Sequence, residues 1–202
     1  MKENKYDDNI FFQKYSQMSR SQQGLAGAGE WETLRKLLPD FKDKRVLDLG
    51  CGYGWHCIYA MEHGASSVVG VDISHKMLEV AKEKTHFPQV EYKCCAIEDV
   101  EFPEESFDVI LSSLAFHYVA DYEILVKKIY RILKSGGKLV FTVEHPVFTA
   151  YGTQDWHYNE KGEILHFPVD NYYYEGKRAA VFLGEKVTKY HRTLTTYLNT
   201  LL

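Results

Sequence analysis

The sequence lacks long apolar runs and has little excess of charge. No apolar stretch approaches the roughly 20 residues that a helix needs to span a bilayer. The polar beginning MKENKYDDN resembles neither a secretory signal nor an Arg-rich transit peptide, so we expect a cytoplasmic protein that does not bind membranes. A formal net charge of -4 gives no global electrostatic reason to bind nucleic acid, which is therefore not an expected partner.

Cysteine is also scarce, with 4 residues in 202. Cys51, Cys57, Cys94 and Cys95 all fall in expected core elements, which favours buried free thiols over disulfides. Cys94 and Cys95 are neighbours in an expected strand and would point to opposite faces. The sequence therefore predicts neither a disulfide framework nor a metal site.

The middle of the chain alternates strand-like and helix-like segments, which is typical of a parallel sheet covered on both faces. The expected strands span 45–49, 68–71, 90–93, 107–112 and 138–143. The expected helices span 27–39, 56–60, 74–84 and 121–133, and Ser74 and Asp121 are the expected N-caps of the last two. Length and composition are those of a single globular domain.

The two ends of the chain differ from this middle. Residues 1–40 are expected to form a helical lid. Phe12, Tyr15, Met18 and Arg20 combine aromatic rings, a methionine and an arginine, and a helix that only faces solvent does not need this combination. A surface helix packed only for stability is the alternative. Residues 41–145 are the expected ligand-binding core. Residues 146–202 are expected to form a substrate cover, with a hairpin around Gly184 and a helix at the end of the chain.

The most informative motif is VLDLGCGYGWH, residues 46–56, which predicts a strand, a tight loop and a helix. A dinucleotide-binding loop has glycine at its first, third and sixth positions. Gly50 and Gly52 fit the first two, but Trp55 stands at the sixth. Asp48, just before the turn, would repel a pyrophosphate and attract an amino group or a sulfonium, and S-adenosylmethionine carries both cations.

A second carboxylate follows in VVGVDIS. Asp72 lies at the end of the second expected strand, where an acid accepts hydrogen bonds from both ribose hydroxyls of a nucleotide. S-adenosylmethionine and NAD both contain an adenosine ribose, so Asp72 alone does not distinguish them.

With these motifs the sequence resembles the class I S-adenosylmethionine-dependent methyltransferases, and within them the small-molecule branch that includes ubiquinone and menaquinone biosynthesis enzymes. The resemblance covers about residues 31–145 and rests on four motifs in order: VLDLGCGYGWH, VVGVDIS, CCAIEDVEFPEESFDVIL and LKSGGKLVF. It implies a three-layer Rossmann-like α/β fold with a mostly parallel sheet, with S-adenosylmethionine as cofactor and S-adenosylhomocysteine as product.

The end of the chain departs from the family pattern, which normally adds two strands after a helix like TLTTYLNTLL. We therefore expect the C-terminal strands to be missing and the chain to be truncated. An exposed sheet edge would then favour self-association. The residues alone leave the oligomeric state open, with a homodimer as the simplest assembly.

The resemblance also implies the residues that contact the cofactor. They are Asp48, Gly50 and Gly52 at the methionine end, Asp72 at the ribose, Ile73, Ala96, Ile97 and Glu98 around the adenine, and Ser113 or Leu114 near the sulfonium. Ala96 stands where many relatives have an acid that accepts the adenine amino group. That contact is therefore expected from Glu98, a backbone group or water.

Methyl transfer is an in-line displacement in which the protein mainly positions donor and acceptor, and a general base adds typically about 10²- to 10⁴-fold. His117 and His145 follow the fourth and fifth expected strands and are the candidate bases, with His145 preferred. Either histidine also suits a purely structural hydrogen bond. On the substrate side the candidates are Tyr15, Met18, Arg20, His191 and the aromatic stretch 151–174, which would suit a flat or phenolic acceptor.

Three functions thus remain open. The first is a methyltransferase acting on a small molecule, and the second is a non-catalytic module that binds S-adenosylmethionine. The third, an NAD-dependent oxidoreductase, is disfavoured by Asp48 and Trp55.

Overall fold

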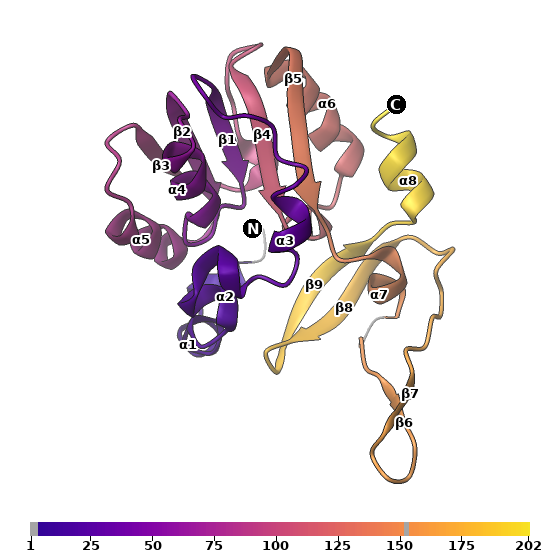
Figure 1. Cartoon of the computed structure of the whole chain (residues 1–202). Helices are drawn as coiled ribbons and strands as arrows, with labels where there is room; N and C mark the ends of the chain where they lie inside the picture. Colours follow the sequence, from indigo (N-terminus) through magenta and orange to yellow (C-terminus); the bar gives the residue numbers. More distant parts are fainter. Residues whose placement is uncertain (1–3, 152–153) are drawn as a thin grey trace.

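The computed structural model describes residues 4–151 and 154–202. Its centre is a parallel sheet of five strands in the order β3-β2-β1-β4-β5 (Figure 1). The strands are β1 (Arg45–Leu49), β2 (Ser67–Asp72), β3 (Val90–Cys94), β4 (Phe107–Ser113) and β5 (Leu133–Thr142). This is the Rossmann-like α/β fold that the sequence predicts. All five predicted strands are found.

Helices cover both faces of this sheet. They include α4 (Trp55–Glu62), α5 (His75–Lys84), α6 (Tyr122–Ile132) and the C-terminal α8 (Leu194–Asn199). Successive side chains of a strand point to opposite faces, so Val46 packs in the apolar cluster under α4 and α5, whereas Leu47 packs in the cluster under α6 and α8. The result is three layers with an apolar core on each side of the sheet.

Both predicted N-caps are confirmed. The Ser74 hydroxyl accepts a hydrogen bond from the Met77 backbone N–H at 3.2 Å, and the Asp121 carboxylate accepts one from the Ile124 N–H at 2.9 Å. These caps satisfy N–H groups that have no partner inside the helix, and they begin α5 and α6 where the sequence predicts.

The helix predicted over residues 27–39 is wrong. The chain there forms a short 3-10 turn, η2 (Gly24–Gly27), and a single helical turn, α3 (Trp31–Leu34). Gly27 packs against the backbone of Ser19 so closely that a Cβ atom would lie 2.3 Å from its carbonyl oxygen, and this contact holds the segment in a turn. The predicted helix would bury Trp31, Leu34, Leu37 and Leu38 on one face. Trp31 and Leu34 are buried, but Leu37 is exposed.

The cysteines are only partly placed as the sequence predicts. All four are free, but Cys94 is exposed, because it lies at the end of the edge strand β3. Cys51 and Cys57 are buried.

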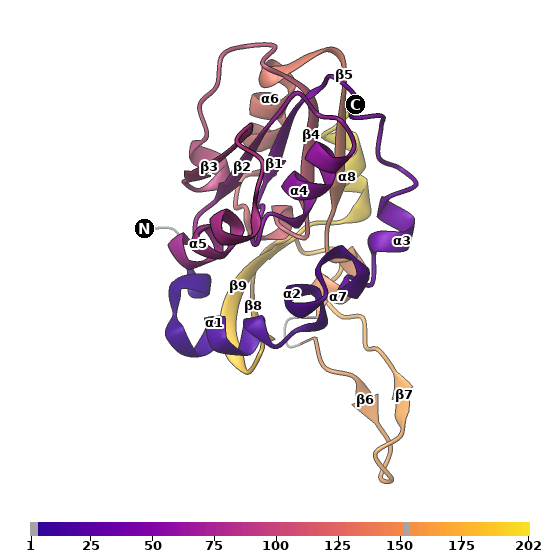
Figure 2. The same ribbon diagram turned by 60° about the vertical axis from the view of Figure 1, so that its left-hand side comes forward.

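The N-terminal segment lies at the carboxyl edge of the sheet, beside α5 (Figure 2). It contains η1 (Lys5–Asp7), α1 (Asn9–Ser16) and α2 (Ser19–Gln22). The Asp7 carboxylate accepts hydrogen bonds from the Ser74 hydroxyl at 2.5 Å and the Lys76 N–H at 3.1 Å. Asp7 therefore fastens this segment to the first turn of α5. Residues 1–3 of the expected lid lie outside the described residues.

The last part of the chain forms two hairpins beyond α7 (Pro146–Ala150). One pairs β8 (Gly176–Phe182) with β9 (Glu185–His191), and the other pairs β6 (His157–Tyr158) with β7 (Ile164–His166). The predicted hairpin around Gly184 is confirmed: Leu183 and Gly184 have positive φ angles of 53° and 78°, as a tight two-residue turn requires.

The β6–β7 hairpin projects away from the rest of the molecule (Figures 1 and 2). Within the described residues, no helix is long and apolar enough to cross a membrane.

Candidate functional site

A cavity of about 650 Å³ lies at the carboxyl edge of the sheet. The chain runs from β1 outward to β3 and then returns to β4 on the other side of β1. At such a reversal the loops after the two central strands separate and leave a crevice where ligands bind. The N-terminal segment and the β8–β9 hairpin supply the remaining walls of this cavity.

The glycine loop after β1 forms part of the wall. Gly50 has a φ angle of 80°, and a Cβ atom on it would lie 2.5 Å from the Ala115 side chain. Gly52 has a φ angle of 52°, yet a Cβ atom there would meet no atom within 4 Å. Gly50 is therefore required by the protein's own packing, whereas Gly52 leaves open space on the side where a ligand would lie.

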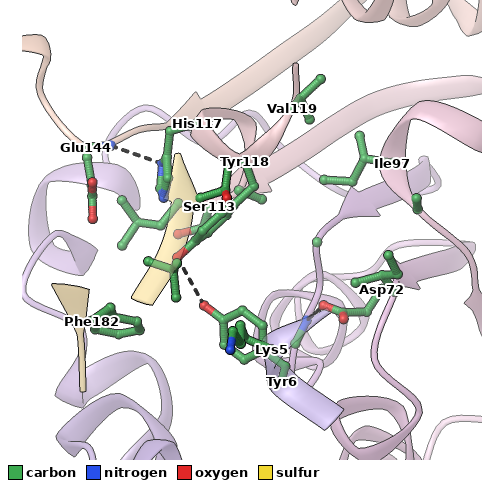
Figure 3. A pocket seen from close by; sticks show the side chains of 18 of the residues that line it. Lys5, Tyr6, Asp72, Ile97, Ser113, His117, Tyr118, Val119, Glu144 and Phe182 are labelled. Carbon is green, nitrogen blue, oxygen red and sulfur yellow. Dashed lines mark hydrogen bonds between the residues drawn. The ribbon is translucent and has the colours of Figure 1, made fainter. Parts of the chain in front are cut away.

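Asp72 lies on the cavity wall as predicted. Its carboxylate accepts hydrogen bonds from the backbone N–H groups of Gly52 and Ser74, both at 2.9 Å, which tie the glycine loop to the end of β2 (Figure 3). Burial raises the pKa of Asp72 to about 6, although these two hydrogen bonds lower it. The carboxylate is thus charged at neutral pH.

Asp48 lies beneath the glycine loop and does not line the cavity. It shares the face of Val46 under α4, because residues two apart in a strand point to the same side. Its Oδ2 accepts a hydrogen bond from the Cys57 thiol at 3.5 Å, and Oδ1 has no hydrogen-bond partner among the described residues. Burial raises the pKa of Asp48 to about 7. This position does not support the predicted direct contact of Asp48 with a cofactor.

The region expected to hold adenine also lies on the cavity. It is lined by Ile73, which follows β2, and by Ala96, Ile97 and Glu98 at the 3-10 turn η3 (Ile97–Asp99). Ile73 and Ile97 offer apolar surface to a flat ring, and the Glu98 side chain is the carboxylate on this stretch of wall.

An ion pair lies at the other side of the glycine loop. Arg20 Nη2 donates to both Glu30 carboxylate oxygens, at 2.9 and 2.7 Å, and the Ser113 hydroxyl donates to Glu30 Oε1 at 3.2 Å. Both members of the pair, with Gly50 and Gly52, line a small side cavity of about 70 Å³. Glu30 does not belong to any motif in the sequence, so the sequence analysis missed it.

The half of the cavity beyond Ser113 and Leu114 is aromatic. The predicted substrate-side residues Tyr15 and Met18 line it, and so does Tyr190. It also contains three residues that the sequence analysis did not single out: Tyr6, Tyr118 and Phe182. The hydroxyl groups of Tyr6 and Tyr118 lie 3.4 Å apart, which joins the N-terminal segment to the 3-10 turn η4 (Phe116–Tyr118) (Figure 3).

His117 lines this aromatic half and is almost fully buried. The Glu144 backbone N–H donates to its Nδ1 atom at 3.4 Å (Figure 3). Burial lowers the pKa of His117 to about 4. The nearby Glu144 carboxylate opposes this shift, and Lys189 and Arg192 add to it. The imidazole is therefore neutral at physiological pH.

His145 and His191 do not line the cavity. The exposed His145 caps α7, with its Nδ1 atom accepting the Val147 N–H at 3.1 Å. His191 is buried between the Thr149 hydroxyl and the Tyr172 carbonyl oxygen, each 2.8 Å from a ring nitrogen. The structure therefore does not support His145 as the preferred base or His191 as a substrate contact.

Glu144 and Lys189 form an ion pair that the sequence analysis missed. The Lys189 ammonium donates to Glu144 Oε1 at 2.5 Å and to Gln154 Oε1 at 3.1 Å, and Lys189 is only 2% exposed. Glu144 lines the cavity beside His117. One feature of the sequence could have indicated Glu144. It directly precedes His145, and neighbouring residues of an extended segment point to opposite sides, so one of the two faces the cavity when the other does not.

The aromatic stretch 151–174 is not the cover that the sequence analysis expects. Its described residues, 151 and 154–174, do not line the cavity, and the wall on this side comes from β8 and β9. Residues 152–153 lie outside the described residues. Within the part of the chain that the structure describes, no group of three or more His, Cys, Asp or Glu residues could hold a metal ion.

Comparison with known proteins agrees with this geometry. The methyltransferase domain family matches residues 47–141. A crystal structure of a Listeria monocytogenes protein assigned to the S-adenosylmethionine-dependent methyltransferases is 57% identical, with a TM-score of 0.82 over 86% of this chain and 81% of that chain. The S-adenosylmethionine-dependent methyltransferase of Mesorhizobium loti is 42% identical, with a TM-score of 0.82 over 88% of this chain and 81% of that one.

A shorter match is to the ubiquinone biosynthesis O-methyltransferase of Coxiella burnetii. It is 36% identical over 112 residues, which cover 54% of this chain and 47% of that enzyme. This chain therefore matches about half the length of that relative.

Proposed function

Because the chain belongs to the class I S-adenosylmethionine-dependent methyltransferases, which are enzymes, we propose that it transfers the methyl group of bound S-adenosylmethionine to a small-molecule acceptor. The proposal rests mainly on one observation. A single cavity has the Asp72 carboxylate and glycine loop at one end and the aromatic residues around His117 at the other (Figure 3). Its volume lies in the range of small-molecule sites.

The residues present fit the cofactor. Two ribose hydroxyls match the free acceptor capacity of the Asp72 carboxylate, and the open space over Gly52 admits a ligand close to the backbone. The amino and carboxylate groups of the methionine end match the charges of Glu30 and Arg20 respectively. When bound, the cofactor supplies an electrophilic methyl group on a sulfonium.

The protein's part in the reaction is mainly positioning. Holding the acceptor in line with the methyl group in a site that excludes water supplies much of the rate enhancement. We propose that the N-terminal segment acts as the lid, because Tyr6 and Tyr15 line the cavity and Asp7 fastens this segment to α5. A small acceptor is supported by the volume of the cavity and by the similarity to the Coxiella burnetii enzyme.

The test is turnover. Purified protein is incubated with S-adenosylmethionine and a mixture of small molecules, and S-adenosylhomocysteine and methylated products are measured by mass spectrometry. We expect S-adenosylhomocysteine to form only when an acceptor is present. Binding of the cofactor without turnover across the whole panel would instead favour a non-catalytic binding module.

The glycine loop allows a sharper test of where the cofactor lies. Gly52→Ala is expected to weaken S-adenosylhomocysteine binding by at least about tenfold, because its Cβ atom would occupy the open space. The left-handed backbone would also lower the free energy of unfolding by about 1–2 kcal/mol. Calorimetric titration and thermal unfolding measure the two effects.

Gly136→Ala is the matched control. Gly136 also has a positive φ angle, of 75°, and open space around it, but it lies outside the cavity lining. We expect a similar loss of stability and unchanged binding. Equal affinities in the Gly52→Ala and Gly136→Ala variants would contradict the proposed position of the cofactor.

A further inference from the structure

The proposed function leaves the chemical class of the acceptor open, and the charges around the aromatic half of the cavity bear on it. Lys5 and Lys177 line this half. Two more cations, Lys189 and Arg192, are buried just behind its wall, close enough to His117 to lower its pKa. Tyr6, Tyr118 and Tyr190 are neutral hydrogen-bonding groups in the same region.

The carboxylate on this side is Glu144, and both of its oxygens have partners. Oε1 accepts from Lys189 and Oε2 accepts from the Gln154 side-chain amide at 3.0 Å. Burial raises the pKa of Glu144, but the charge of Lys189 and the hydrogen bonds from Lys189 and Gln154 hold it below its usual value. Glu144 is therefore ionised and paired with Lys189, which leaves Arg192 as the buried cation near His117 that no carboxylate pairs among the described residues.

Arg192 is held by neutral partners. Its guanidinium group donates to the carbonyl oxygens of Val119, Ala120 and Phe116, which surround η4. These neutral acceptors satisfy its hydrogen-bonding groups without cancelling its charge. The buried cation therefore adds a positive contribution to the potential at this end of the cavity.

The hydrogen bond to His117 also bears on the class of acceptor. A neutral imidazole carries one proton, and Nδ1 accepts from the Glu144 N–H, so the proton lies on Nε2. Among the described residues the structure gives Nε2 no hydrogen-bond partner. His117 therefore offers a hydrogen-bond donor to the cavity rather than the lone pair that a general base needs.

Building on the proposed function, we propose that the aromatic half of the cavity binds the methyl acceptor as an oxyanion, a carboxylate or a phenolate, with the His117 Nε2–H group donating to it. The oxyanion's lone pair forms the new O–C bond as the C–S bond breaks, and that electron pair stays on sulfur. The sulfonium becomes a neutral thioether, and no proton is released. The step therefore needs no base.

An ammonium acceptor is the competing class, because aromatic rings and a carboxylate also bind cations. The ion pair with Lys189 argues against it, since an ammonium would have to compete for Glu144 with a buried lysine only 2.5 Å away.

Calorimetric titration of protein saturated with S-adenosylhomocysteine distinguishes these classes. Benzoate, benzamide and benzylamine have similar shapes and differ in charge, and 4-nitrophenol supplies a phenolate near neutral pH. We expect benzoate or 4-nitrophenolate to bind at least about tenfold more tightly than benzamide and benzylamine. The tighter of the two oxyanions then identifies the acceptor as a carboxylic acid or a phenol.

Two pairs of variants test which residues are responsible for oxyanion binding. His117→Gln keeps an N–H donor near the Nε2 position and is expected to retain oxyanion binding, whereas His117→Phe should weaken it by about tenfold without changing benzamide binding. Lys177→Gln should weaken oxyanion binding, and Lys186→Gln, which removes the same charge from an exposed position of β9 outside the cavity lining, should not.

Tighter binding of benzylamine, equal binding of all four probes, or no oxyanion binding to the loaded protein would overturn the inference. Failure of S-adenosylhomocysteine itself to bind would contradict the proposed function as well. The two failures are thus distinguishable in one set of titrations.

Discussion

Asp72→Ala is expected to weaken S-adenosylhomocysteine binding by at least about 100-fold. Hydrogen bonds to a charged acceptor contribute about 1.5–3 kcal/mol each, and in the proposed complex the Asp72 carboxylate accepts from both ribose hydroxyls. The variant also frees the Gly52 N–H, which Asp72 holds at 2.9 Å. Calorimetric titration of the folded variant measures the loss.

Asp170→Ala is the matched control, because it removes the same charge from an exposed position outside the cavity lining. Its affinity should equal that of the unmodified protein. An Asp72→Ala variant that binds within a few-fold of this control would show that the ribose does not lie on Asp72.

The same residue predicts how binding depends on pH. Burial raises the pKa of Asp72 to about 6, and only the ionised carboxylate accepts from both hydroxyls. Affinity should therefore be full above this pKa and fall as the pH drops through it. The Asp72→Ala variant should lose this dependence between about pH 8 and pH 5.

The same pKa shift of Asp72 also determines how the stability of the protein without ligand changes with pH. Because the folded pKa lies above the ordinary value of 3.8, the contribution of Asp72 to stability without ligand is present at low pH and lost as the pH rises through about 6. A ligand that hydrogen-bonds to the carboxylate offsets that loss. The rise in Tm on adding S-adenosylhomocysteine should thus be larger at about pH 8 than at about pH 5.

Lys189→Ala is expected to lower the free energy of unfolding by about 3–5 kcal/mol. Removing one member of a buried ion pair leaves the other charge without a partner, and here Glu144 would lose the ammonium 2.5 Å away. For a chain of this size the Tm should fall by roughly 6–20 °C. Thermal unfolding followed by circular dichroism measures it.

A double variant separates the unpaired charge from the lost side-chain volume. Lys189→Met with Glu144→Gln removes both charges and nearly keeps the volumes, so most of the stability should return. Lys186→Ala on the exposed side of β9 should change stability by less than about 0.5 kcal/mol. A Lys189→Ala variant as stable as Lys186→Ala would mean that the pair does not hold the β9 hairpin against the sheet.

The sheet could be predicted from the sequence because its signals are local. Runs such as Val46–Leu49 are too apolar to lie outside a core, and the glycines that follow can take positive φ angles that other residues avoid. Asp72 could be placed for the same reason, since the end of a parallel strand always lies at the ligand-binding edge.

The acceptor side could not be predicted, because its residues come together only through tertiary contacts. A lysine is normally exposed, and nothing near Lys189 in the sequence reveals the Glu144 carboxylate 45 residues away. The sequence favours His145 over His117 as the base, but as the N-cap of α7 the His145 ring turns to the Val147 N–H instead of the cavity. The aromatic stretch 151–174 has the composition of a cover, yet its β6–β7 hairpin projects outward.

Calorimetric titration of the unmodified protein with S-adenosylhomocysteine and, separately, with NADH tests the central claim most directly. We expect saturable binding of S-adenosylhomocysteine with a one-to-one stoichiometry and a Kd in the micromolar range, and no binding of NADH. Tight binding of NADH, or no binding of S-adenosylhomocysteine by folded protein, would contradict the assignment of this cavity to a sulfonium cofactor.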